Sequence, residues 1–135
     1  MEISITQKSG RANVTLLHLK GKLDGGSYRG FVEAAQKVYD SGAMNILIDL
    51  TDVSFLSSAG ISGLHSVALM FRGEKSDPEA GWDAFRAIDR DRGSGVQKHV
   101  KLLNPQPEVL RVIEMVGFSS FFEVYMDLEN ALSSF

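Results

Sequence analysis

The sequence contains no cysteine, so neither a disulfide framework nor a thiolate metal site is available to it. It also has no apolar run near the roughly 20 residues that a membrane-spanning helix needs. The first residues, MEIS, lack the basic and apolar regions of a signal peptide. These absences indicate a cytoplasmic protein that makes no direct membrane insertion.

An excess of basic charge is missing as well. The chain has 14 Lys and Arg residues against 17 Asp and Glu residues, which gives a formal net charge of −3. A non-specific nucleic-acid binder carries a basic stripe, whereas the basic residues here are scattered, so we expect no nucleic-acid partner. The length of 135 residues predicts a single domain covering residues 1–135.

Apolar periodicity predicts strands and helices that alternate along the chain. The first two strands are joined by the turn-forming sequence SGRA and are expected to form a hairpin. This order favours an α/β fold with a mixed, mainly parallel sheet, an N-terminal hairpin and about four helices. The expected strands lie at residues 3–5, 13–20, 44–50, 100–103 and 121–126, and the helices at 28–39, 61–71, 109–116 and 128–135.

Residues 73–98 interrupt this alternation. Eleven of these 26 residues are charged, four are Gly and one is Pro, so the segment is expected to be a long insertion. A loop of that length without its own structure is unusual inside a compact domain. Trp82, Phe85 and Ile88 are spaced to give it a short helix that packs on the body. A solvated insertion and a contact surface for a separate partner both remain open.

The stretch DLTDVSFLSSAGISGL, residues 49–64, places paired serines where an expected strand passes into an expected helix. Ligands and partners of parallel sheets gather at the carboxyl ends of the strands. The loop GKLDGG, residues 21–26, ends a neighbouring strand, so Asp24 and Ser58 are expected to lie close together. The serines have three readings: a helix N-cap by Ser57 or Ser58, a catalytic nucleophile, or a residue that another protein modifies.

The catalytic reading needs a general base beside the serine. His18 lies in the middle of a strand, His65 lies two helical turns beyond Ser58, and His99 opens a strand at the opposite end of the sheet. The sequence GISG is one residue short of the hydrolase pattern G-x-S-x-G. There is also no P-loop and no His-Glu metal spacing. The catalytic reading is therefore the weakest of the three.

The modification reading rests on the position at the start of a helix. A phosphate is tolerated there because unpaired N–H groups and the helix dipole favour an anion. It would add about −1.5 to −2 charges to the surface, which would repel a docked partner. The residues alone leave the cap and the phospho-acceptor readings open.

The two loops together resemble the STAS domain family, in particular the anti-sigma factor antagonists, also called anti-anti-sigma factors. The family pattern runs roughly D-L-x-x-V-x-F-x-D-S-x-G-[LI]-x-x-L, preceded by a G-x-L-D loop. The order of the expected elements also agrees over nearly the whole chain, as does the sequence GF at 117–118. The matching residues are Asp49, Leu50, Val53, Phe55, Ser58, Gly60, Ile61 and Leu64, with Gly21, Leu23 and Asp24 in the earlier loop.

This resemblance implies a binding protein for transcription regulation, not an enzyme, with no cofactor and no metal. Such an antagonist binds an anti-sigma factor that is also a serine/threonine kinase, and thereby releases a sigma factor. Phosphorylation of the motif serine abolishes binding, and a serine phosphatase restores it. Ser58 matches the acceptor, with Ser57 as second candidate. The implied partner-binding residues are Asp24, Ser57, Ser58, Gly60 and Ile61.

The sequence departs from the family at two places. Ser57 stands where an Asp is usual, which replaces a carboxylate beside the acceptor by a second hydroxyl. The segment 73–98 is longer than the usual connection. An alternative role is therefore a STAS module that acts as a scaffold or regulatory subunit in a stress-signalling complex or with a lipid or anion transporter.

Overall fold

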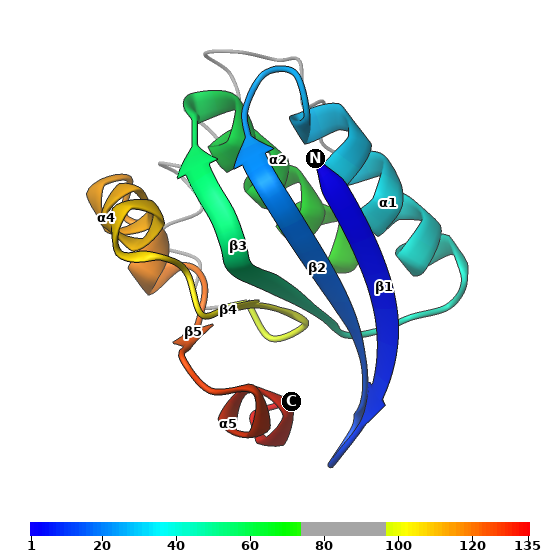
Figure 1. Cartoon of the computed structure of the whole chain (residues 1–135). Coiled ribbons are helices and arrows are strands. Elements are labelled where there is room, and N and C mark those ends of the chain that lie inside the picture. Colours follow the sequence, from blue (N-terminus) through cyan, green and yellow to red (C-terminus); the bar gives the residue numbers. More distant parts are fainter. Residues whose placement is uncertain (74–96) are drawn as a thin grey trace.

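A five-stranded sheet carries the other elements (Figure 1). The computed structural model describes residues 1–73 and 97–135, so the helix expected around Trp82 lies outside the described residues. The strand order is β1-β2-β3-β4-β5, with β1 antiparallel to β2 and all other neighbours parallel. The strands are β1 Glu2–Ser9, β2 Asn13–Leu23, β3 Ile46–Leu56, β4 Val100–Leu103 and β5 Val124–Tyr125.

Helices follow the strands in the predicted order, which confirms the α/β fold with its N-terminal hairpin. They are α1 Tyr28–Asp40, α2 Ser58–Phe71, α4 Pro107–Met115 and α5 Leu128–Ser133, with a short 3-10 turn at Phe118–Ser120. None of the helices in the two described ranges is both long and apolar enough to cross a bilayer.

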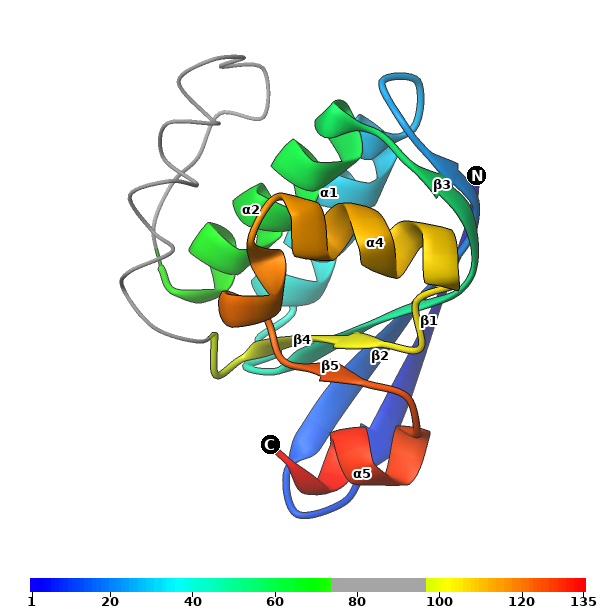
Figure 2. The same cartoon turned by 90° about the vertical axis from the view of Figure 1, so that its left-hand side faces the viewer.

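The sheet has two unequal faces because side chains alternate along a strand. Ile46 and Ile48 of β3 belong to the main core that α1, α2 and α4 cover, which we call the helical face. Leu47 points the other way, toward a small core under α5. Figure 2 shows α5 apart from the other helices, near the lower end of the sheet. The remainder of the opposite face has no helix among the described residues.

Two strands are longer than the sequence predicts. β2 continues through Leu23 and β3 through Leu56, so the expected loops at 21–23 and 51–56 are wrong. The pairing passes through two bulges, at each of which β3 has one residue more than β2, between His18 and Lys20 and between Gly21 and Lys22. The buried residues of β3 after Leu50 are therefore spaced by three, at Val53 and Leu56, and a search for strict alternation misses them.

The last strand is shorter than predicted. Only Val124–Tyr125 pairs with β4, although the expected strand began at residue 121. Phe121 and Phe122 instead belong to the main core, where their rings pack edge to face with centroids 4.9 Å apart. Gly117 adopts a φ of 81°, which lets the chain turn out of α4 toward these rings. Burial of the aromatic pair overrides the strand propensity of the segment.

A buried lysine attaches α5 to the sheet. Lys101 of β4 is only 4% exposed and points toward the small core. Its Nζ donates to the carbonyl oxygen of Ser134 at 2.9 Å and to the hydroxyl of Ser134 at 3.0 Å. The ammonium also lies 2.6 Å from a carboxylate oxygen of Glu123 and 4.8 Å from the ring centroid of Phe135. One side chain thus joins β4, the start of β5 and the segment after α5.

Replacing Lys101 should loosen α5 selectively. Lys101→Ala removes these hydrogen bonds, and we expect it to lower the free energy of unfolding by about 2 kcal/mol. Amide hydrogen exchange should speed up most in Leu128–Ser133. Lys98→Ala, at an exposed position nearby, is the matched control and should change neither quantity. Unchanged exchange in α5 of the Lys101→Ala variant would contradict this role.

Candidate functional site

The carboxyl ends of β2 and β3 meet beside the first turns of α1 and α2, at the top of Figure 1. Leu23 pairs with Leu56, and the backbone N–H of Ser57 donates to the carbonyl oxygen of Leu23 at 3.0 Å. The prediction that the loop around Asp24 and the serine junction are neighbours is therefore confirmed. Residues 34 positions apart in sequence share one edge of the sheet.

Ser57 and Ser58 hold different positions at this junction. Ser57 is the only residue between β3 and α2, and its hydroxyl accepts a hydrogen bond from the N–H of Gly60 at 3.3 Å. It is therefore the N-cap of α2. Ser58 is the first residue of the helix, and its side chain is exposed. The capping position is thus occupied by Ser57, and the hydroxyl of Ser58 is accessible from solvent.

Gly60 and Ile61, further along the motif, are buried and hold the start of α2 against the end of β2. A Cβ added to Gly60 would lie 2.5 Å from the carbonyl oxygen of Leu23 and 2.7 Å from Leu56 Cδ1. Only glycine lets the first turn of α2 approach the end of β2 this closely. Ile61 is 3% exposed and belongs to the main core. Of the residues expected to bind a partner, Asp24, Ser57 and Ser58 retain exposed surface.

The loop around Asp24 is held by its own side chains. Asp24 Oδ1 accepts from the N–H of Gly26 at 2.9 Å, which makes a turn of the kind Asp favours. Ser27 occupies the N-cap position of α1, yet its hydroxyl makes no cap bond. Instead it accepts from the N–H of Asp24 at 3.0 Å and donates to the carbonyl oxygen of Lys22 at 2.6 Å. The carboxylate of Asp24 is thereby presented in a fixed turn.

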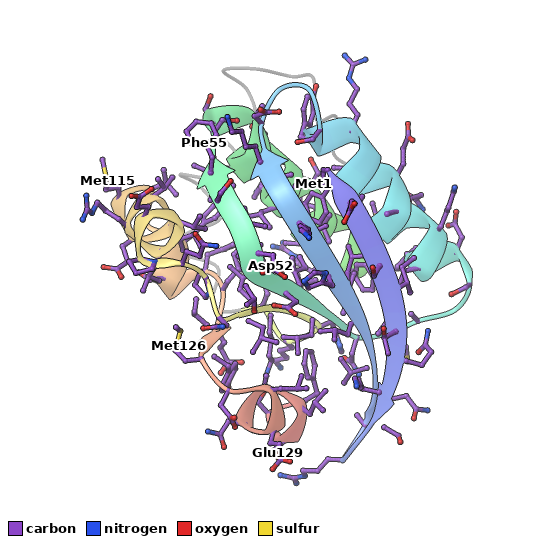
Figure 3. All side chains as sticks on the ribbon, in the orientation of Figure 1. Met1, Asp52, Phe55, Met115, Met126 and Glu129 are labelled. Carbon is purple, nitrogen blue, oxygen red and sulfur yellow. The ribbon has the colours of Figure 1, made fainter. Side chains whose placement is uncertain are left out.

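Phe55, beside the junction, was not expected from the sequence as a surface group. Phe55 is 50% exposed, and its strand partner Lys22 is exposed as well. Figure 3 shows Phe55 at the end of β3. The second bulge turns Phe55 outward, and alternation could not reveal this because it fails at the bulge. The resemblance contained the only sequence indication, since Phe55 is one of its motif positions.

The carboxyl end of β4 does not reach the serine junction. Because Leu103 pairs with Asp49, β4 ends beside the middle of β3. A separate polar cluster lies there: Thr51 Oγ1 donates to Asp49 Oδ1 at 2.5 Å, and Asn104 Nδ2 donates to Thr51 Oγ1 at 3.2 Å. Gln106 also donates to the carbonyl oxygen of Thr51, at 3.0 Å. The cluster connects β3 to the loop after β4. Asp49, which lies within β3, contributes by accepting the hydrogen bond of Thr51.

The three histidines are placed away from Ser58. His18 Nε2 lies 2.7 Å from Asp52 Oδ2, on the face opposite the main helices, where Figure 3 shows Asp52. His99 Nδ1 lies 2.9 Å from Asn45 Oδ1, before the first residues of β4 and β3 and so at the other end of the sheet. His65 is buried in the middle of α2. The described residues therefore give the nucleophile reading no support.

Comparisons with known proteins bear on the family and on the fold. A model of the STAS domain family matches residues 6–75, just over half of the chain. An anti-sigma factor antagonist from Mycobacterium paratuberculosis is similar in structure, with a TM-score of 0.65, 17% identity, and 98% of this chain and 93% of that chain covered. No curated protein matches the sequence significantly.

Two structures of the anti-sigma factor antagonist SpoIIAA share the fold as well. The unphosphorylated form has a TM-score of 0.58 at 16% identity, covering 96% of this chain and 94% of that chain. The phosphorylated form, from Bacillus, has a TM-score of 0.52 at 15% identity, covering 96% and 97%. The predicted fold class is thus confirmed.

The free energies of unfolding of two variants test whether Ser57, and not Ser58, caps α2. Ser57→Ala removes the cap of α2 and should lower the free energy of unfolding by about 1 kcal/mol. Ser58→Ala, one residue further on an exposed position, should change it by less than about 0.5 kcal/mol. Urea unfolding of the two variants provides the comparison. Equal losses, or a larger loss for Ser58→Ala, would show that Ser57 is not the cap.

The close approach at Gly60 predicts that alanine is destabilising there but not at Gly30. Gly60→Ala should destabilise the protein by about 2 kcal/mol, because the added methyl group meets the backbone of β2. Gly30→Ala is the control: a Cβ at this exposed site in α1 meets nothing within 4 Å, so the better helix propensity should raise stability by up to about 1 kcal/mol. Thermal unfolding is the measurement. If the unfolding temperature shifts in the same direction in both variants, the packing argument is contradicted.

Proposed function

The chain belongs to the STAS domain family, and on this premise we propose that it is an anti-sigma factor antagonist switched by phosphorylation of Ser58. The observation that carries the proposal is the position of Ser58 as the exposed first residue of α2, next to a neighbour that already caps the helix. The fold shared with anti-sigma factor antagonists supports the same role.

The unmodified junction offers a compact surface for a partner. Asp24 and Lys22 contribute charges of opposite sign, and the half-exposed ring of Phe55 contributes apolar area. Aromatic side chains, Phe among them, are enriched in the cores of protein interfaces. We propose that an anti-sigma factor with serine/threonine kinase activity docks here, together with Ser57 and Ser58, and releases its sigma factor in exchange.

Phosphoryl transfer would then reverse the binding. The oxygen of Ser58 attacks the γ-phosphorus of ATP held by the kinase, the bond to the bridging oxygen breaks, and ADP leaves while the serine proton passes to a base of the kinase. The dianion at the first turn of α2 is stabilised by the helix dipole, so the fold does not have to change. The added charge repels or must be desolvated by the partner, which weakens docking.

A serine phosphatase would complete the cycle by transferring the phosphoryl group to water. Because the kinase consumes ATP, the cycle is a cytoplasmic one. No cofactor of the chain itself is involved.

Ser57 in place of the usual Asp affects this switch in two ways. It removes a carboxylate that would repel the new phosphate on Ser58, and its hydroxyl is engaged with the N–H of Gly60. Phosphorylation of Ser57 would exchange this cap for a bulky dianion. The geometry therefore favours Ser58 as the acceptor and leaves Ser57 as the second candidate.

The switch predicts how variants bind. Tagged wild-type protein and Ser58→Ala should co-purify the kinase partner from the native host, whereas Ser58→Glu should lose at least about tenfold in affinity, or 1.4 kcal/mol. Lys37→Glu, which adds the same kind of charge on α1 away from the junction, is the control and should bind normally. Undiminished binding by Ser58→Glu would refute the switch.

Peptide mass spectrometry of the protein from its native host tests the acceptor directly. A phosphate on Ser58 is the expected result, and a phosphate on Ser57 alone would move the switch by one residue. If neither serine is modified under any growth condition and the co-purified partner is a transporter or a signalling scaffold, the alternative role as a constitutive STAS subunit replaces the proposal.

A further inference from the structure

β1 is the outer strand of the sheet, and among the described residues its outer side pairs with no other strand (Figure 1). The strand is eight residues long, whereas β5 at the other edge has only two paired residues. Long edge strands present a row of backbone donors and acceptors that can pair with another chain. Proteins often protect such edges with Pro, a bulge or a central charge. β1 has none of these, since Lys8 lies near its end and the pairing with β2 is regular.

The side chains of β1 are largely accessible. Six of its eight residues are exposed, and only Ile3 and Lys8 are partly buried. Ile5, in the middle of the strand, is 50% exposed. It lies opposite Leu17 and therefore points to the helical face, where α1 does not cover it fully. An apolar side chain is thus accessible at the centre of an unpaired edge.

The sequence of β1 is complementary to itself when it runs antiparallel. With Ile5 facing Ile5 of a second copy, Ser4 faces Thr6, Ile3 faces Gln7, and Glu2 faces Lys8 at both ends. Opposite charges, hydroxyl pairs and apolar pairs directly across strands each stabilise a sheet. We propose that a second copy of this chain pairs here, β1 against β1, around a two-fold axis through Ile5. The two sheets then form one continuous sheet of ten strands.

Other registers lose this complementarity. A shift by one residue would place side chains on the wrong faces. A shift by two in one direction sets Ile3 against Ile5 but leaves Lys8 beyond the end of the strand. A shift by two in the other direction sets Lys8 against Ser4 and Ile5 against Gln7. Each of these registers is two-fold symmetric, but only the one centred on Ile5 joins an Ile–Ile pair with two opposite-charge pairs.

This pairing leaves the serine junction accessible. The junction lies between β2 and β3, on the side of β2 away from the edge of the sheet that β1 forms. Each dimer would therefore carry two Ser58 sites. The inference concerns assembly and stands independently of the role proposed for that residue.

Charge exchange across the interface provides the test. Sedimentation velocity over a concentration series should show a dimer for the wild-type protein. Glu2→Lys and Lys8→Glu each turn two attractive pairs into repulsive ones, so each should weaken dimerisation by about tenfold. A mixture of the Glu2→Lys chain with the Lys8→Glu chain restores opposite charges at both ends, and a dimer should return. Lys98→Glu, remote from β1, is the control for the change in net charge.

Ile5→Lys should also give a monomer, because it places two ammonium groups together at the two-fold axis. The exposed position is compatible with an unchanged fold, which circular dichroism can verify, and the charge variants test the same interface without altering Ile5. A wild-type monomer at every concentration would overturn the proposal. So would a dimer that survives each single change, or a mixture that fails to restore the dimer.

Discussion

The close contact between the first turn of α2 and the end of β2 is the constraint on which the site depends. It consists of the hydrogen bond from the N–H of Ser57 to the carbonyl oxygen of Leu23 and of the space left by the missing side chain of Gly60. The contact joins the end of β2, which Asp24 follows, to the start of α2, where Ser57 and Ser58 lie. The N-cap bond of Ser57 then follows, because Ser57 alone separates the last residue of β3 from the first residue of α2.

The two bulges of β3 make this contact possible. Beyond them β3 continues to Leu56, well past the end of β4, so that among the described strands only the end of β2 lies beside the serine junction. The same bulges turn Phe55 outward. A surface with an exposed serine at a helix start, two opposite charges and one aromatic ring is suited to binding another protein and to losing that partner when a dianion is added.

The face of the sheet opposite the helical face and the edge formed by β1 are separate from the serine junction. Lys101 joins α5 to one part of the opposite face through hydrogen bonds to Ser134 and the ion pair with Glu123. Among the described residues the outer side of β1 is unpaired, and this is the edge of the proposed dimer. The proposed partner surface, the attachment of α5 and the proposed dimer interface therefore lie on different parts of one sheet.

The sequence by itself determined the order of the elements, the helical stripes and the nearness of Asp24 to the serines, because these depend on local periodicity and on the rules of parallel sheets. It also contained the motif that assigns the family. Only the tertiary structure decided which serine caps α2, where β3 ends and which way Phe55 points. Each of these three features depends on contacts between segments that are distant in sequence. The bulges in β3 also break the alternation of buried and exposed residues from which a strand is recognised. The short β5 has the same explanation, since the core selects Phe121 and Phe122 for burial over strand pairing.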